Sequence, residues 1–422
     1  MIHDPVVRTI VLDDDPTGTQ CATNVTVLLG GGEAELAAAL RVSASVYYET
    51  NTRSLDVAAA VRLVRRVRRD GEAAAASLGV EVRFVLRGDS TLRGHVFEEA
   101  AEFLDPRGVI LLVPAYPEGG RTTEGGIHFL DQGSGKVPVA LTEFARDPVF
   151  GYSTSDLGEF VRSRSDRPSI KVPLEGVRAG LLQEALLAAP DGAVVIPDVV
   201  TDGDIRQIAH AVDLVLQAGR QIVVRCAAPL AAELAGVRSD SYLEVPFQPA
   251  PLGLLVVCGS HTEGARSQVD HLAAQFGAPS VIRTEAALED PLAEAERVAT
   301  AELEAMEARG FAFIATERTR LPEHGSLAHG STIMSALTQA ASLLIPAVDA
   351  VITKGGITSS EILRTAAGAT TTRVLGQFEP GISAVTLETG TGRRLVCVVV
   401  PGNVGDQGAL ARIVRDLGFD KE

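Results

Sequence analysis

The sequence predicts an α/β protein with two domains, each a mostly parallel β-sheet flanked by helices. Short apolar runs alternate with stretches of helical periodicity along most of the chain, which is typical of parallel sheets. The chain has 422 residues, more than one hydrophobic core usually serves. The segment 240–253 has no helical period and contains three prolines, so we place a linker there. We therefore expect domains at residues 1–245 and 252–422.

The composition argues against several classes of protein. Hydrophobic residues make up 46% of the chain and charged residues 22%, as in ordinary globular proteins. A net charge of −16, with 4% aromatic residues and no tryptophan, argues against binding to nucleic acid or to an anionic membrane surface. The apolar runs are too short to span a bilayer, and the N-terminus does not resemble a signal peptide. The four scattered cysteines fit reduced, buried thiols, so we expect a cytoplasmic protein.

Strands and helices are expected in alternation through the first domain. Apolar runs bounded by turn residues predict strands at 9–12, 25–29, 45–48, 82–86, 109–113, 194–196 and 222–225. Helical spacing predicts helices at 33–41, 56–77, 96–104, 181–187, 202–218 and 230–234. This order predicts a sheet with helices on both faces.

The same alternation restarts after the linker. Strands are predicted at 254–258, 280–282, 311–315, 350–353, 374–378 and 395–400. Helices are predicted at 262–275, 291–308, 332–344, 359–364 and 409–417.

The first predicted strand ends in three consecutive acids, Asp13, Asp14 and Asp15, followed by a Pro-Thr-Gly turn. In an open α/β sheet, ligands bind at the carboxyl ends of the strands. Three carboxylates at such an end would repel one another unless a cation or hydrogen-bond donors shared them. We therefore treat this strand end as the centre of a candidate site.

Two further strand ends carry Arg, Asp and hydroxyl side chains. They contribute Arg87, Asp89, Ser90, Arg93 and Arg121, the last between two glycine pairs where a ligand can approach the backbone closely. An Arg guanidinium matches carboxylate or phosphate, whereas Asp and hydroxyls suit sugar-like OH groups. Taken singly, these stretches are explained as well by a helix cap with surface arginines, or by an exposed loop. Because the carboxyl ends of parallel strands meet at one edge, together they predict a pocket for a small hydroxylated anion.

The second domain contains three strand-to-helix turns rich in small residues, at 258–264, 353–360 and 400–408. Backbone amides at a glycine-rich helix N-terminus form an anion site, usually for phosphate. One such turn alone is more often ordinary turn chemistry, but three in one domain favour a phosphate site. The chain has neither a G-x-x-x-x-G-K-[ST] loop nor a G-x-G-x-x-G after a strand, so any nucleotide binds differently. The histidines and cysteines show no zinc-ligand spacing.

Taken together, these motifs resemble those of the four-carbon acid sugar kinases, which are ATP-dependent kinases of threonate, erythronate and 3-oxo-tetronate. The resemblance covers nearly the whole chain. In the first domain it rests on Asp14-Asp15-Pro16-Thr17-Gly18, Thr52-Arg53, Asp89-Ser90-Thr91-Leu92-Arg93-Gly94 and Pro114-Ala115-Tyr116-Pro117-Glu118-Gly119-Gly120-Arg121-Thr122-Thr123. In the second it rests on Gly259-Ser260, Gly355-Gly356-Ile357-Thr358-Ser359 and Pro401-Gly402-Asn403-Val404-Gly405.

The resemblance implies that the first domain binds the acid sugar and the second binds ATP, with the active site in the cleft between them. Asp14 or Asp15 is expected to orient the attacking hydroxyl and accept its proton, while Arg87 and Arg93 hold the substrate's carboxylate or hydroxyls. The other implied substrate-binding residues are Thr17, Arg53, Asp89, Ser90, Arg121 and Thr122. The implied nucleotide-binding residues are Ser260, Lys354, Gly355, Gly356, Ile357, Thr358, Ser359, Gly402, Asn403 and Gly405. Mg²⁺ is expected to bridge the phosphates, without a metal site built by the protein.

Two departures from the family pattern leave an alternative open. Ile357 stands where the family usually has an acid, and Pro401 stands where it usually has Ser. Lys354, beside the first of these turns, is a candidate substitute cation. The alternative is a non-catalytic sugar-acid binding or sensor protein with degraded nucleotide loops, whereas the missing dinucleotide motif disfavours an oxidoreductase. We expect small-molecule partners only, and a homodimer as the default assembly.

Overall fold

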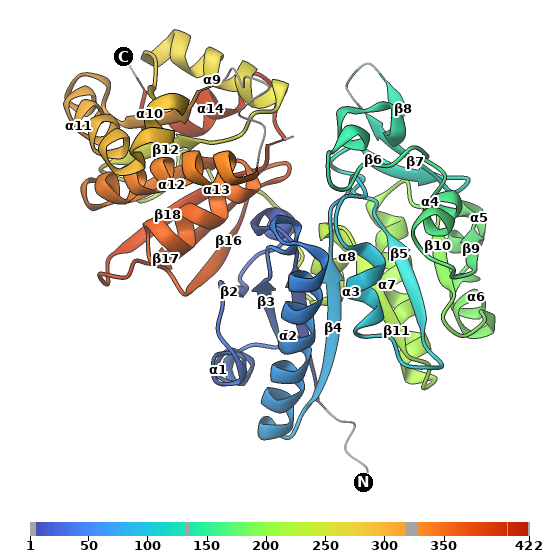
Figure 1. Ribbon diagram of the computed structural model, residues 1–422. Coiled ribbons are helices and arrows are strands. Elements are labelled where there is room, and N and C mark those ends of the chain that lie inside the picture. The colour runs from blue at the N-terminus through green and yellow to red at the C-terminus, as the bar shows by residue number, and fades with distance from the viewer. Residues whose placement is uncertain (1–5, 132, 134, 318–326, 403, 421–422) are drawn as a thin grey trace. The chain divides into compact units, whose positions relative to one another are not determined.

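The structure is a computed structural model that describes residues 6–131, 133, 135–317, 327–402 and 404–420 (Figure 1). The chain forms two compact units, Met1–Ser239 and Asp240–Glu422. Both are α/β, with a mostly parallel sheet and flanking helices, as the sequence predicts. In the described ranges, no helix combines the length and the apolar character needed to cross a membrane.

The first unit is built on a parallel sheet in the strand order β2-β3-β1-β4-β11-β5-β10-β9. Its strands are β1 (Val7–Asp13), β2 (Thr26–Leu28), β3 (Ser45–Glu49), β4 (Glu81–Arg87), β5 (Val109–Val113), β9 (Ser169–Val172), β10 (Val194–Pro197) and β11 (Ile222–Cys226). The register places Asp13 opposite both Glu49 and Arg87. The ends of β1, β3 and β4 are therefore level, and the residues that follow them emerge together.

Helices cover both faces of this sheet. They are α1 (Glu33–Val42), α2 (Val57–Leu78), α3 (Val96–Ala101), α4 (Leu157–Arg164), α5 (Leu174–Arg178), α6 (Leu182–Ala188), α7 (Asp202–Gln217) and α8 (Ala228–Leu234). Ile10 and Leu12 of β1 belong to one buried cluster, whereas Val11, which points the opposite way along the strand, is fully buried outside that cluster. Burial on both faces explains why these strands read as continuous apolar runs.

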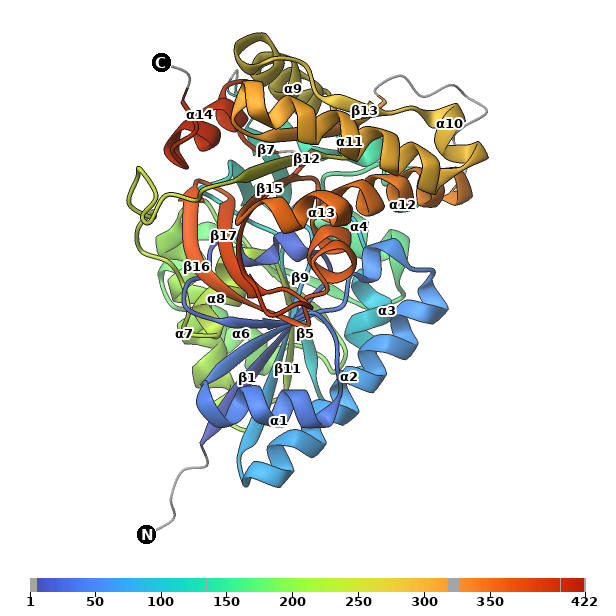
Figure 2. The ribbon, with the colours of Figure 1, turned by 90° about the vertical axis from the view of Figure 1, so that its left-hand side faces the viewer.

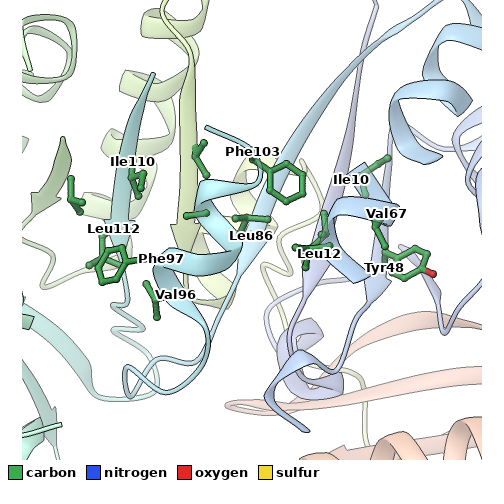
Figure 3. Close-up of a cluster of buried hydrophobic side chains, with 14 of the residues drawn as sticks. Ile10, Leu12, Tyr48, Val67, Leu86, Val96, Phe97, Phe103, Ile110 and Leu112 are labelled. Carbon is green, nitrogen blue, oxygen red and sulfur yellow. The ribbon is translucent and has the colours of Figure 1, made fainter. Parts of the chain in front are cut away.

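The cluster on one face joins strands β1, β3, β4 and β5 to helices α2 and α3 (Figure 3). Ile10 and Leu12 lie with Tyr48 and Val67, and Leu86 of β4 lies between them and the side chains of β5. Full burial of a side chain of this size contributes about 1.5–3 kcal/mol. Because such a core is close-packed, it holds the strand ends in fixed positions.

A small antiparallel sheet follows β5 and was not predicted. It contains β6 (Arg121–Glu124), β7 (Ile127–Asp131) and β8 (Lys136–Pro138), in that order. Gly125 and Gly126 have φ values of 60° and 75° and form the two-residue turn between Glu124 and Ile127. Consecutive positive φ values favour glycine, so this glycine pair makes a hairpin turn rather than the ligand-approach loop that we expected.

The second unit contains a mixed sheet in the order β13-β14-β12-β15-β18-β17-β16. Its strands are β12 (Leu254–Cys258), β13 (Ser280–Ile282), β14 (Ala312–Thr316), β15 (Ala350–Lys354), β16 (Thr371–Glu379), β17 (Ile382–Glu388) and β18 (Arg394–Val400). The pairs from β13 along the order to β18 are parallel, whereas β17 is antiparallel to both β18 and β16. Strand β17 was not predicted; Figure 2 shows it with β16 as a long ribbon.

The helices of the second unit follow its parallel strands. They are α9 (Glu263–Phe276), α10 (Thr284–Glu289), α11 (Pro291–Arg309), α12 (Leu327–Leu344), α13 (Gly356–Glu361) and α14 (Ala409–Asp416). Thr262 caps α9, since its hydroxyl accepts a hydrogen bond from the amide of Ala265 at 3.2 Å. Helix α9 packs on α14, while α11 packs on α10 and α12. Helices α9, α13 and α14 each start just after a strand, which places the three glycine-rich turns at strand ends.

Candidate active site

The ends of β1 and β4, with the turn that follows β3, bring together acids and arginines in the first unit. The cluster has two layers, which we define by burial. The lower layer is Asp13, Asp14, Arg87, Glu99 and Arg225, whose side chains are at most 3% exposed. The upper layer is Asp15, Arg53, Asp89 and Arg93, whose side chains are between 8% and 23% exposed.

In the lower layer, two different arginines hold the two oxygens of Asp14. Arg87 Nη1 lies 3.3 Å from Asp14 Oδ1, and Arg225 Nη2 lies 3.2 Å from Asp14 Oδ2. Arg87 Nη1 also donates to Asp13 Oδ1 at 2.9 Å, and Arg225 Nη1 donates to Glu99 Oε2 at 2.5 Å. Buried charges persist in a fold when they are paired in this way. The Asp14 carboxylate is therefore fixed from both sides.

Asp13 is less well compensated. Within the described part of the chain, its Oδ2 is buried and has no hydrogen-bond partner. Burial raises the pKa of Asp13 to about 7; the charge of Arg87 opposes this rise, while the neighbouring acids add to it. A Cβ at Gly18 would lie 2.1 Å from both carboxylate oxygens of Asp13, so only glycine lets the following turn close over this acid.

In the upper layer, Arg53 links the two acids. One of its amino groups forms an ion pair with Asp15, and the other lies 3.6 Å from Asp89 Oδ1. Arg93 Nε donates to Asp89 Oδ2 at 2.8 Å. Burial alone would raise the pKa of both acids, but Arg53 and Arg87 hold the pKa of Asp15 below its usual range, and Arg93 and Arg53 do so for Asp89. Both acids are therefore carboxylates at neutral pH and can accept hydrogen bonds.

Short turns position the upper layer. Residues Pro16–Thr19 form a turn of 3-10 helix, and Asp15 caps it by accepting from the amide of Thr17 at 2.8 Å and from the Thr17 hydroxyl. Thr17 therefore orients Asp15. The amide and hydroxyl of Thr50 both donate to the carbonyl of Asp13 at 2.8 Å, which carries the turn with Arg53 over the end of β1.

Burial separates the two arginines that were expected to hold the substrate. Arg87 is 2% exposed and bound to Asp13 and Asp14, which argues against the predicted contact with a ligand and makes it a residue that positions the acids. The guanidinium of Arg93 lies 5.0 Å from the centre of the Phe144 ring, and its side chain is 23% exposed. Arg93 is therefore the one of the two that reaches the surface.

The hairpin that carries Arg121 and Thr122 is attached to the Asp89–Arg93 turn. His128 of β7 contacts the carbonyl of Ser90 through Nε2 at 2.8 Å, and its Nδ1 lies 3.0 Å from the Thr123 hydroxyl. Burial lowers the pKa of His128 to about 4, so the ring is neutral. The Thr122 hydroxyl donates to Glu124 Oε1 at 3.3 Å. The structure thus places all the predicted substrate residues at one edge of the first unit, with Ser90 contributing its backbone.

Arg225 and Glu99 were not predicted. Arg225 lies inside the apolar strand β11, and Glu99 lies on α3. A signal was present, because a charged residue in the middle of an apolar strand is almost never buried without a partner. The identity of that partner could not be predicted, since Glu99 is far from it in sequence.

In the second unit, the three glycine-rich turns meet at Ser260. Strands β12, β15 and β18 are neighbours, so the turns after them lie together. A Cβ at Gly402 would lie 2.8 Å from Ser260 Oγ, and one at Gly355 would lie 3.2 Å from Ser260 Cβ. The Thr262 hydroxyl donates to the carbonyl of Gly402 at 2.7 Å and ties the first turn to the third. Glycine at positions 355 and 402 therefore lets the turns close on Ser260, and we call this cluster of backbone and hydroxyl groups the cradle.

The remaining predicted nucleotide residues have different surroundings. Lys354 is fully buried, and its Nζ donates to the carbonyls of Pro401 at 2.7 Å and Val404 at 2.9 Å. Burial lowers the pKa of Lys354 to about 8. These contacts argue against its predicted role as a substitute cation, because the ammonium group already holds the third turn in place. Ile357 is 53% exposed and offers no polar side-chain atom.

The other residues predicted to bind the nucleotide lie at the start of α13 and in the third turn. Gly356 begins α13, Thr358 and Ser359 are buried behind it, and the Ser359 hydroxyl donates to the carbonyl of Gly355 at 2.8 Å. Gly405 has a φ of 88°, while Asn403 lies outside the described residues. In the described ranges, no group of three or more His, Cys, Asp or Glu side chains is arranged to hold a metal ion.

Comparison with known proteins identifies both units. Residues 9–234 match the family model described as a sugar-binding N-terminal domain, and residues 255–410 match a nucleotide-binding C-terminal domain. The chain is 33% identical over 188 residues to the D-threonate kinase of Salmonella typhimurium, and 30% identical over 239 residues to the D-erythronate kinase of Heliobacterium modesticaldum. The chain belongs to the four-carbon acid sugar kinase family. The two matched segments cover 43% and 55% of this chain.

The matched segments span 41% and 52% of the two relatives' own lengths, so the correspondence with these curated kinases extends over about half of each. Two solved structures are similar in fold to this chain over nearly its whole length. A Haemophilus influenzae protein matches with a TM-score of 0.61 and 17% identity, over 94% of this chain and 97% of its own. A Salmonella typhimurium LT2 protein matches with a TM-score of 0.70 and 17% identity, over 97% and 99%. At this identity, the likeness shows the fold alone.

Proposed function

We propose that the protein is an ATP-dependent kinase that phosphorylates a hydroxyl group of a four-carbon sugar acid such as threonate, erythronate or 3-oxo-tetronate. The upper layer carries this proposal, because it holds ionised carboxylates beside arginines at a strand edge that reaches solvent. Carboxylates accept hydrogen bonds from sugar hydroxyls, and guanidinium groups donate to anions. Family membership and the names of the two kinase relatives support the same substrate class.

Asp15 is the proposed base. Its carboxylate is ionised and oriented by Thr17, and its side chain is 10% exposed, compared with 1% for Asp14, so it can accept a hydrogen bond from the attacking hydroxyl and take its proton. Asp14 is an unsuitable base, because its side chain is 1% exposed and both of its oxygens are held by arginines. We therefore assign Asp14 to positioning Arg87 and Arg225.

ATP is proposed to bind the second unit at the cradle around Ser260. The residues fit a polyphosphate, because glycine at positions 355 and 402 lets two turns approach Ser260 closely, which gathers backbone groups beside the hydroxyls of Ser260 and Thr262. When bound, Mg·ATP supplies the phosphoryl group and neutralises its charge. We assign no protein carboxylate to Mg²⁺, since Ile357 stands at the family's acid position and the described residues form no acidic metal cluster.

The cysteines support a location in the cytoplasm as part of this proposal. Cys21, Cys226 and Cys397 are free thiols, and all three are buried, as is Cys258. Unpaired buried thiols suit a reducing compartment.

A coupled ADP-release assay over a panel of four-carbon sugar acids, with the neutral polyols threitol and erythritol as controls, tests the proposal. We expect ATP- and Mg²⁺-dependent turnover of at least one acid and far lower turnover of the polyols. Calorimetry with Mg·ATP and with each acid runs in parallel. Binding of an acid without binding of Mg·ATP, and without turnover, would overturn the proposal in favour of a non-catalytic binding protein.

A further inference from the structure

Among the described residues, four of the five arginines at the candidate site are paired with an acid. Four have carboxylate partners: Arg53 with Asp15, Arg87 with Asp13 and Asp14, Arg93 with Asp89, and Arg225 with Asp14 and Glu99. Arg121, at the start of β6, has no carboxylate of the described residues within ion-pair distance.

The Arg121 guanidinium is also short of other partners. The residue is 7% exposed, and its Nη1 donates to the carbonyl of Gly119. Its Nε is buried and has no hydrogen-bond partner in the described part of the chain. An arginine stays charged in proteins, and burying a charge without a counter-ion is unfavourable. Among the residues that the structure describes, this cation therefore has no carboxylate partner.

A buried Nε without a hydrogen-bond partner also occurs at Arg53 and Arg87, but those two arginines have carboxylate partners and Arg121 does not. Acids outweigh the effect of burial at Arg53, Arg87 and Arg225, so their pKa values are raised. Burial lowers the pKa of Arg121, because the more distant Asp89 does not compensate for it. The charges of Asp89 and Arg93 both act on the pKa of Arg121, so Arg121 lies near the upper layer.

The position of Arg121 is fixed by the hairpin. The amide of Arg121 donates to the carbonyl of Tyr116, and that of Tyr116 to the carbonyl of Arg121, both at 2.8 Å. His128 of the next strand is anchored to the carbonyl of Ser90 in the turn that carries Asp89. A Cβ at Gly119 would lie 2.9 Å from Arg121 Nη1, so a side chain there would displace the guanidinium. The unpaired cation is therefore held beside the upper layer by the same elements that form it.

We propose that Arg121 receives the carboxylate of the substrate and thereby selects sugar acids over neutral polyols. This inference rests on the proposed function and names the residue that sets its substrate class. The Nε edge of a guanidinium is one of the two edges that bind a carboxylate through parallel hydrogen bonds. A sugar acid supplies the missing anion, whereas a polyol of the same length leaves the charge unpaired. Arg93 and Arg53, already paired with acids, are left to donate to substrate hydroxyls or transferred phosphate.

The test compares Arg121→Gln and Arg121→Lys with the wild-type chain. Arg69→Gln is the matched control, because Arg69 lies on α2 of the same unit with a side chain that is 74% exposed. The readouts are the calorimetric Kd of the preferred acid without nucleotide, its KM and kcat, and the inhibition constant of the matching polyol. For Arg121→Gln we expect the Kd and KM of the acid to rise about 10- to 100-fold, as for loss of a charge-assisted contact. The kcat and the polyol inhibition constant should change little, and Arg121→Lys should lie between.

Several outcomes would overturn the inference. An unchanged Kd for the acid in Arg121→Gln would do so, as would equal weakening of acid and polyol, which a purely structural role predicts. If Arg121→Gln fails to fold, Arg121→Lys provides the test, because it keeps the positive charge and loses the paired N–H donors of the guanidinium. Wild-type affinity of Arg121→Lys for the acid would then contradict the inference. Failure of the proposed function is separable, since the wild-type chain would then turn over no acid while its binding of acids could still depend on Arg121.

Discussion

Replacing Arg225 with Met should strongly destabilise the first unit. Arg225 is 3% exposed and lies 3.2 Å from Asp14 Oδ2 and 2.5 Å from Glu99 Oε2. Met fills much of the same space but leaves both carboxylates buried without this partner. Removing one member of a buried charge cluster costs about 3–5 kcal/mol. In a unit of this size, that loss lowers the Tm by about 6–20 °C.

The loss should grow with pH. Burial already raises the pKa of Glu99, and Arg225 opposes that rise, so its removal raises the pKa further. An acid with a higher pKa in the folded state than in the unfolded state binds protons better when folded. The free energy of unfolding therefore falls as pH increases above the unfolded pKa of Glu99, 4.5. Calorimetric scans at pH 5.5 and pH 8 should show the larger gap between variant and wild type at pH 8.

Two further variants control this experiment. Glu99→Gln in the Arg225→Met background removes one of the two charges that have lost Arg225 as a partner, and it should recover part of the stability at pH 8. Arg162→Met changes an arginine on α4 whose side chain is 66% exposed, and it should leave the Tm almost unchanged. The reasoning is refuted if Arg225→Met resembles Arg162→Met, or if its destabilisation does not depend on pH.

Three other changes test the site. Asp15→Asn should lower kcat about 10²- to 10⁴-fold while leaving the calorimetric Kd of Mg·ATP unchanged; wild-type turnover would contradict its assignment as the base. Gly402→Ala places a Cβ 2.8 Å from Ser260 Oγ and should weaken ATP binding without changing that of the acid; equal loss of both would point to misfolding. The raised pKa of Asp13 makes the free energy of unfolding fall as pH rises from 3.8 to about 7, so Asp13→Asn should flatten this dependence in urea titrations. An unchanged slope would argue against a buried, proton-binding Asp13.

Most of the parallel sheet could be predicted from the sequence because its strands are apolar on both faces. Strands β1, β5 and β12 read as uninterrupted runs between turn residues, and the structure confirms them. The β6–β7 hairpin was not predicted, since Thr122, Thr123 and His128 are polar residues buried by contacts that a sequence pattern does not display. Strand β17 was not predicted either, although it pairs with both of its neighbours in the chain.

The site could be located from the sequence, but its internal order could not. Acids and arginines at successive strand ends predict where the cluster lies. They do not predict which side chains are buried, because Asp13, Asp14 and Asp15 are consecutive residues with different surroundings. Their roles depend on Arg225 and Glu99, whose separation along the chain hides the pairing. Arg121 stands out only because the other four arginines of the site have carboxylate partners.

The two-layer arrangement constrains how the substrate range of such a protein can diverge. In the lower layer, Asp14, Glu99 and Arg225 depend on one another, so a change at one position is tolerated only with compensating changes at the others. Residues of the upper layer touch solvent, and exchanging one polar group for another there disturbs the fold less. Relatives that use different acids should therefore change positions 14, 99 and 225 only as a set, while most differences in specificity fall at positions 53, 89, 93 and 121. Laboratory redesign of specificity should follow the same division and leave the buried set intact.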